Sequence, residues 1–163
     1  MVDIPRPREL TVGLLYRHMG DKLNLKPVDD GTGHSRIVIS QDISRPGMAL
    51  TGYMHKFLHE RIQIFGETEI SFLLSLSGPD REKAVNRLFQ EPVYCSIVTK
   101  GLEPPEALVK ASRRTSSALF RGKSSSLAKA WINCDLFISS PAKVLSRARC
   151  QSLLVISIRS IEK

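Results

Sequence analysis

The most distinctive polar residues of this sequence lie in a short loop, residues 41–47, which follows a β-branched run. Arg45 could bind an anion, because the N–H donors of a guanidinium match the oxygens of phosphate and carboxylate groups. Asp42 and Ser44 could instead cap the following turn through hydrogen bonds to nearby backbone N–H groups. Since open α/β sheets commonly bind ligands where strands end, we predict a candidate anion- or partner-binding loop here. A purely structural turn is the alternative.

Two further basic residues also flank predicted strands. Arg61 comes directly before the apolar run at residues 62–65, and Lys100 comes directly after the run at residues 95–99. Both residues therefore join Asp42, Ser44 and Arg45 in the candidate set, again with a structural turn as the alternative role.

The sequence identifies no catalytic centre, metal site or cofactor site. His55 and His59 are four residues apart, but the Glu that a metalloprotease motif needs after the first His is missing. The sequence GKS at residues 122–124 resembles the end of a phosphate-binding loop, yet Ser117 stands where that loop has its first glycine. Such a loop also follows a buried strand, and we expect residues 118–121 to form a poor one. We therefore assign no catalytic, metal-binding or cofactor-binding residue.

Apolar periodicity and turn residues indicate that helices and strands alternate along the chain. Such alternation favours an α/β layer architecture with a mixed or parallel sheet. We expect helices at residues 9–19, 50–57, 69–76, 80–89 and 106–111, and strands at residues 36–40, 62–65 and 95–99.

Length and composition predict one ordinary domain followed by a tail. The chain has 163 residues, 42% hydrophobic and 25% charged, as in globular proteins that bury a core. Its net charge of +8 suggests a nucleic-acid partner. However, residues 1–112 hold 14 basic and 14 acidic side chains, whereas residues 113–163 hold 10 and 2, with 11 serines. We therefore expect an N-terminal domain over residues 1–112, a divergent Ser/Arg/Lys-rich tail over residues 113–163, and nucleic-acid binding only as a minor alternative.

Cysteine usage and hydropathy indicate a cytoplasmic protein with no membrane partner. Cys95, Cys134 and Cys150 include no C-x-x-C spacing, so neither a disulfide framework nor a zinc cluster is indicated. The first residues have no apolar signal core, and no apolar run approaches the roughly 20 residues that cross a bilayer.

Four phrases of the sequence together resemble the N-terminal domain of bacterial HPr kinase/phosphorylase. They are DISRPG at residues 42–47, ERIQIFG at residues 60–66, ETEISFL at residues 67–73 and IVTKGLEPP at residues 97–105. Each phrase alone is modest evidence, but their order and spacing are specific. The resemblance covers roughly residues 10–112.

The resemblance implies a three-layer α/β/α domain, similar to the N-terminal domains of Mur-ligase enzymes. In the family this domain precedes a catalytic domain, which uses ATP or pyrophosphate, with Mg²⁺, to phosphorylate a serine of the phosphocarrier HPr. That catalytic domain also removes the phosphate by phosphorolysis, and it assembles as a hexamer. Its phosphate-binding loop, metal ligands and catalytic acid/base lie downstream of the matched residues, so none is carried over to this chain.

The sequence therefore predicts a regulatory or scaffolding domain of carbon-metabolism control that is inactive without its kinase domain. The partners implied are HPr or a kinase domain, and a homo-oligomer is a further option. A free-standing, non-enzymatic module that binds a ligand or a protein is the alternative from another class. The change of charge after residue 112 also suggests a disturbed reading frame near residues 112–125, and hence a truncated or degenerate family member.

Overall fold

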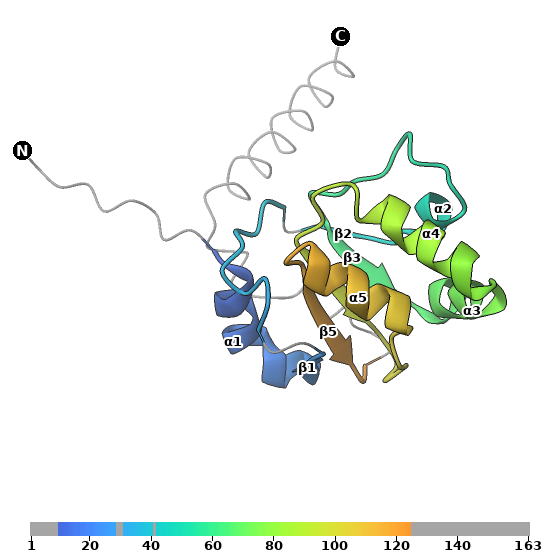
Figure 1. The fold of residues 1–163 in the computed structure, drawn as a ribbon. Helices are drawn as coiled ribbons and strands as arrows, with labels where there is room; N and C mark the ends of the chain where they lie inside the picture. Colours follow the sequence, from blue (N-terminus) through green and yellow to red (C-terminus); the bar gives the residue numbers. More distant parts are fainter. Residues whose placement is uncertain (1–9, 29–30, 41, 125–163) are drawn as a thin grey trace, which may run out of the picture. The chain divides into compact units, whose positions relative to one another are not determined.

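In the computed structural model of the protein, the described residues are 10–28, 31–40 and 42–124, which form a mixed five-stranded sheet with helices (Figure 1). The strands are β1 (Leu25–Pro27), β2 (Ile43–Ser44), β3 (Ile62–Phe65), β4 (Cys95–Val98) and β5 (Ala118–Gly122). The helices are α1 (Val12–Leu23), α2 (Gly47–Leu50), α3 (Glu67–Ser75), α4 (Gly78–Leu88) and α5 (Glu106–Arg114).

The order of the strands across the sheet is β1-β5-β4-β3-β2. The pairs from β2 to β5 are parallel, and β1 is antiparallel to β5 at the other edge. Ligand crevices in open α/β sheets arise where the strand order reverses. Because β2, β3, β4 and β5 follow one another in chain order, no such reversal occurs among these four parallel strands.

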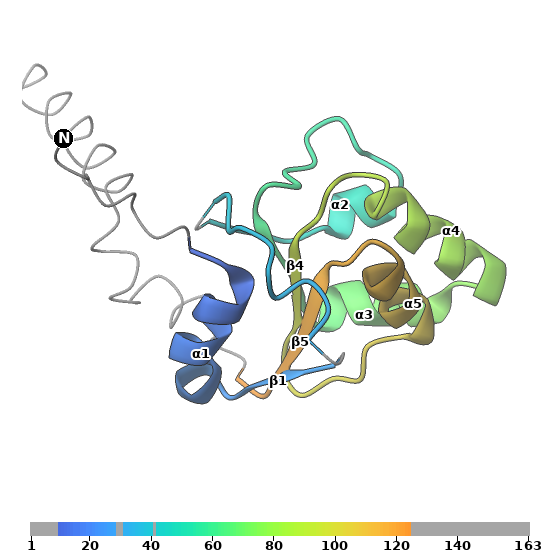
Figure 2. The ribbon, with the colours of Figure 1, turned by 60° about the vertical axis from the view of Figure 1, so that its left-hand side comes forward.

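Helices α2–α5 cover one face of the sheet and α1 covers the other (Figure 2). Side chains of a strand alternate between the two faces, so Phe65, Val98 and Leu119 point toward α2–α5. There they join one buried cluster with residues of the helices, among them Leu50, Ile70, Leu73, Val85, Leu88 and Leu108. The mixed sheet with helices confirms the expected α/β class.

The opposite face is closed by α1. Phe120, next to Leu119 in β5, stacks on Tyr16 of α1 with a distance of 5.1 Å between the ring centroids. Leu15 and Met19 of the same helix are only 1% and 2% exposed. At the start of α1, the Thr11 hydroxyl caps the helix by accepting a hydrogen bond from the Leu14 N–H at 3.2 Å.

The segment at residues 31–40 is anchored against the start of β5. Arg36 donates hydrogen bonds from one guanidinium nitrogen to the carbonyls of Val93 (3.3 Å) and Thr115 (3.2 Å). Gly33 has a φ of +80°, and a Cβ built on it would lie 2.5 Å from the Ala118 nitrogen. Only glycine combines this backbone conformation with so close an approach.

Two predicted elements, the strand at residues 36–40 and the helix at residues 50–57, are wrong. Residues 36–40 form a single bridge, between Thr11 and Ile37, and the edge strand β2 forms instead inside the predicted loop. The helix expected at residues 50–57 ends at Leu50, since Gly52 adopts a φ of +110°. A glycine in this conformation stops a helix.

Two further strands and the end of α1 differ from expectation. Helix α1 runs through Gly20 to Leu23, and Asn24 caps it in the left-handed conformation. The short strand β1 follows. We expected residues 118–121 to form a poor strand, yet they belong to the buried strand β5. Pairing with β4 on one side and β1 on the other stabilises this strand.

The expected domain boundary at residue 112 lies within α5, and the sheet continues beyond it through β5. The separate nature of the C-terminal segment stays a prediction, because residues 125–163 are outside the described part of the chain. Within the described residues, none of the helices combines the length and hydropathy needed to cross a membrane.

Candidate functional site

The five candidate residues lie at two different edges of the sheet. Because β2, β3, β4 and β5 are parallel, the residues that follow them meet at one edge, here called the carboxyl edge. The residues that precede them meet at the opposite, amino edge. Ser44, Arg45 and Lys100 belong to the carboxyl edge, whereas Asp42 and Arg61 belong to the amino edge.

Lys100 at the carboxyl edge is engaged in an internal ion pair. Its ammonium group lies 2.5 Å from a carboxylate oxygen of Glu67, the first residue of α3. The hydrogen bond from Lys100, and then its positive charge, lower the pKa of the Glu67 carboxyl below its ordinary value. Lys100 is held there by a turn in which it and Gly101 both have positive φ, +58° and +65°. Lys100 thus connects the end of β4 to the first turn of α3.

Arg45 lies beside the first turn of α3. A Cβ built on Gly66, which precedes this helix, would be 3.2 Å from a terminal nitrogen of the Arg45 guanidinium. The backbone N–H of Gly66 already donates to the Glu69 carboxylate at 2.8 Å, and Glu69 is only 4% exposed. The guanidinium and the helix N-terminus both attract anions, but the Glu67 and Glu69 carboxylates oppose this attraction. Ser44, half-buried in β2, pairs in register with Gln63 of β3.

The turn after β4 is fixed by a residue that the sequence analysis did not single out. Arg121 of β5 donates to the carbonyl of Gly101, at 2.9 Å from its Nε, and forms an ion pair with Glu103. An arginine in the middle of an apolar strand is the signal that could have found it, because a charged group in such a place needs partners.

The amino edge holds a surface ion pair. The Arg61 guanidinium lies 3.4 Å from the Asp42 carboxylate, whose side chain is 67% exposed. The backbone of the two segments is also joined, since the Ile62 N–H donates to the Asp42 carbonyl at 3.1 Å. Asp42 and Arg61 therefore join the starts of β2 and β3.

Tyr94 secures the chain just before the amino edge. Its hydroxyl donates to the Ser40 carbonyl at 2.7 Å. Burial, opposed only partly by this hydrogen bond, raises the pKa of the Tyr94 hydroxyl far above its ordinary value. Tyr94 is therefore a neutral, structural hydrogen-bond donor.

No metal site occurs among residues 10–28, 31–40 and 42–124, where no three His, Cys, Asp or Glu side chains are gathered suitably for an ion. His55 and His59 lie in turns rather than on one helix face. His55 packs edge-on against Tyr53, and His59 lies within 4 Å of Glu60 and Glu91.

The sequence GKS at residues 122–124 does not form the end of a phosphate-binding loop. Gly122 is the last residue of β5, pairs with Leu25 of β1 and accepts a hydrogen bond on its carbonyl from the Gly101 N–H at 2.8 Å. Ser117, at the position of the loop's first glycine, is fully buried. A phosphate-binding loop needs free backbone N–H groups that converge on an anion, and here the backbone of Gly122 is part of the sheet.

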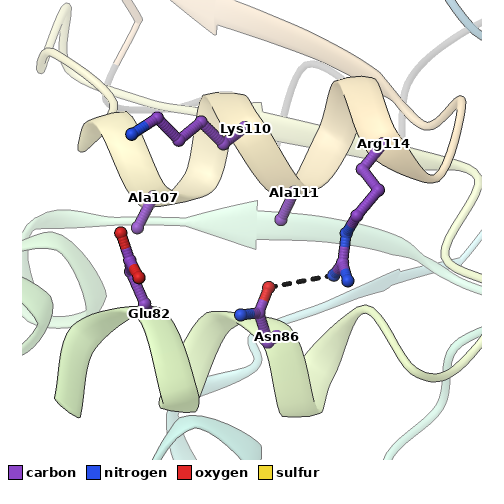
Figure 3. A pocket seen from close by; sticks show the side chains of 6 residues that line it. All are labelled: Glu82, Asn86, Ala107, Lys110, Ala111 and Arg114. Carbon is purple, nitrogen blue, oxygen red and sulfur yellow. Dashed lines mark hydrogen bonds between the residues drawn. The ribbon is translucent and has the colours of Figure 1, made fainter. Parts of the chain in front are cut away.

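A groove between α4 and α5 was not anticipated from the sequence. Figure 3 shows it, with a volume of about 210 Å³. The lining residues come from both helices: Glu82 and Asn86 of α4, and Ala107, Lys110, Ala111 and Arg114 of α5. Their spacing of three and four residues is the sequence signal of a common helix face, but that spacing does not reveal which helices become neighbours.

Comparison with known proteins places these features in a family. The family model described as "HPr Serine kinase N terminus" matches residues 10–130. In the sequence alone, the family resemblance is limited to roughly residues 10–112. The family model continues to residue 130, so that limit is wrong.

Three relatives, each named HPr kinase/phosphorylase, show the extent of the match. The chain is 38% identical to the Latilactobacillus sakei protein over 54% of this chain and 29% of the relative. It is 44% identical to the Lacticaseibacillus casei protein over 47% and 24%, and 40% identical to the Clostridium perfringens protein over 55% and 30%. The chain thus spans less than about a third of these relatives' length. Because the family model matches well over half of its residues, the chain belongs to the HPr serine kinase N terminus family.

Proposed function

We propose that this chain acts as a regulatory or scaffolding N-terminal domain of a cytoplasmic HPr kinase/phosphorylase and does not phosphorylate HPr by itself. The observation that carries the proposal is the use of Gly122 in the sheet, together with the buried Ser117, at the one place where the sequence approaches a phosphate-binding motif. The family match over residues 10–130 supplies the context.

The substrates of the whole enzyme belong to this proposal as well. ATP with Mg²⁺ would bind to the kinase domain of the family, and HPr or that kinase domain would be the partner of this chain. The paired charges at both sheet edges support a scaffolding role, because Asp42, Arg61, Glu67 and Lys100 serve contacts within the domain.

A phosphotransfer assay tests the proposal directly. The purified 163-residue chain is incubated with HPr, ATP and Mg²⁺, and the Lacticaseibacillus casei enzyme serves as the positive control. We expect no phosphoserine on HPr from this chain, and sustained turnover would overturn the proposal. A chimera in which residues 10–124 replace the matching part of the L. casei enzyme should retain its assembly state and activity if the domain is a scaffold. A chimera that folds but neither assembles nor reacts would contradict the scaffolding role.

A second candidate function rests on the position of Arg45. Its exposed guanidinium lies at the carboxyl edge beside the start of α3, and no described residue forms an ion pair with it. We propose this place, with Ser44 and Lys100, as the anion-binding loop of a non-enzymatic module. Inorganic phosphate should then raise the melting temperature of the chain, and Arg45→Ala should abolish the rise. Arg61→Ala, at the amino edge, is the matched control, and an equal loss in both variants would exclude the site.

A further inference from the structure

The groove between α4 and α5 has a regular, two-level construction (Figure 3). At one level Glu82 of α4 lies opposite Ala107 of α5, and at the next level Asn86 lies opposite Ala111 and points toward Arg114. The Lys110 side chain runs along α5, away from Glu82. Within each helix, the residues of the two levels are four positions apart. Such residues are neighbours on a helix surface, about 5–6 Å from one another. The two alanines keep the floor low: Ala111 is only 2% exposed and Ala107 is half-buried, so another chain can approach closely at Ala107.

The charges of the groove are divided between its two rims. Lys110 and Arg114 place positive charge along the α5 rim, whereas the α4 rim holds Glu82 and the neutral Asn86. The Lys110 ammonium forms an ion pair at 2.9 Å with Glu106 of its own helix, and not with Glu82 across the groove. The Arg114 guanidinium donates one hydrogen bond to Asn86 at 2.9 Å, and a guanidinium has five N–H donors in all. All four charged or amide side chains are exposed.

We propose that the α4–α5 groove is a docking site for a helix of a protein partner with two acidic residues four positions apart. The acidic pair would bind Lys110 and Arg114, whose own spacing is the same, and a small side chain of the partner helix would rest on the half-buried Ala107. A helix laid into a groove between two helices is an established mode of recognition. A neutral or basic residue of the partner would face Glu82.

Charge complementarity selects this occupant over the other candidates. The C-terminal segment of the same chain, residues 125–163, carries six basic and two acidic side chains, so it would be repelled by the α5 rim. A second copy of the domain has no helix among its described residues with acids four positions apart. A nucleic acid would place phosphates against Glu82, and no aromatic side chain lines the groove for base stacking.

A pair of synthetic peptides tests the inference with the full chain. Both are alanine-rich helices of identical composition, with two Glu four positions apart in the first and two positions apart in the second. We expect the first peptide to bind at least about tenfold more tightly by fluorescence anisotropy, since only its two carboxylates share a face, and to lose affinity as salt screens the charges. Equal binding of the two peptides would overturn the inference.

Three variants locate the contact. The double charge reversal Lys110→Glu with Arg114→Glu should lower the affinity for the first peptide by about tenfold or more. The matched control is Lys83→Glu with Arg113→Glu, which reverses exposed charges of the same two helices outside the groove lining, and it should leave the affinity within about twofold. Ala107→Leu fills the floor without changing the charge and should also weaken binding, with folding verified by circular dichroism.

Two outcomes would exclude the groove as the docking site. If the control charge reversal lowers the affinity for the first peptide as much as the groove reversal does, the attraction is a diffuse effect of net charge. If a single-stranded oligonucleotide binds more tightly than the peptide and loses its affinity in the groove reversal, the occupant is a nucleic acid.

Discussion

The two edges of the sheet carry similar charged residues but differ in how deeply those residues are built into the fold. At the carboxyl edge, Glu69 is buried against the start of α3, and Lys100 connects the end of β4 to that helix. At the amino edge, Asp42 and Arg61 form an ion pair on the surface. The same residue types therefore contribute unequally to the free energy of unfolding, because a buried carboxylate with a backbone partner is costly to remove and an exposed ion pair is not.

The amino edge nevertheless contains the position most sensitive to change, and that position is uncharged. In Gly33→Ala, the added Cβ would lie 2.5 Å from the Ala118 nitrogen at a φ of +80°. Relief requires movement of the backbone at the start of β5, so we expect a loss of about 3 kcal/mol or more in the free energy of unfolding. Urea denaturation measures it, and Gly78→Ala, where the added Cβ meets nothing within 4 Å, is the control. Similar stabilities of the two variants would contradict the close approach.

The next largest effect is expected at the carboxyl edge, from Glu69→Ala. This change leaves the Gly66 N–H at the start of α3 without its carboxylate partner. We expect a loss of about 1–2 kcal/mol in the free energy of unfolding, the usual cost of removing a helix N-terminal cap. Hydrogen exchange at Gly66 should accelerate at the same time. Unchanged protection of this amide would show that the capping contact is not formed.

A smaller effect is expected from the amino-edge pair. Arg61→Ala, which removes one partner of the exposed ion pair with Asp42, should cost less than about 1 kcal/mol in the free energy of unfolding. A double-mutant cycle with Asp42→Ala measures the coupling between the two side chains. A coupling as large as the Glu69→Ala effect would remove the contrast between the edges.

The smallest effect concerns the titration of Glu67. Its pKa is lower in the folded chain than in the unfolded one, because Lys100 favours the charged carboxylate. The resulting stability is present above the unfolded pKa and is lost as the pH falls through the folded pKa. NMR titration should show the pKa of Glu67 returning to its ordinary value in Lys100→Ala. An unchanged titration would mean that the ion pair is absent in solution.

Sequence reasoning succeeded where the local pattern and the tertiary context agree. The strands at residues 62–65 and 95–98 and the helices α3, α4 and α5 carry local patterns of apolar and turn residues that predict them. It failed at β2 and β5, whose strand character depends on neighbours in the sheet. Ile43–Ser44 has only two residues in the ladder, and Arg121 interrupts the apolar run of β5.

The candidate site shows the same division. The sequence placed Arg61 and Lys100 next to the strands at residues 62–65 and 95–99, and the structure has them beside β3 and β4. It placed Asp42, Ser44 and Arg45 in a loop after a strand at residues 36–40, whereas β2 forms within that loop. The separation of these residues between two opposite edges depends on the direction of each strand. Strand direction is set by the crossover connections and not by the residues at the strand ends. Whether the five candidate residues lie together could therefore not be predicted without the sheet.

The sequence by itself determined the α/β class, the family and the uneven distribution of charge, since periodicity, ordered motifs and composition are local or additive properties. Only the tertiary structure decided that β5 completes the sheet beyond residue 112, that Gly122 is held within it, and that α4 and α5 enclose a charged groove. The physical reason is that strand pairing and helix packing join residues far apart in the chain, and burial then assigns each residue type its partner.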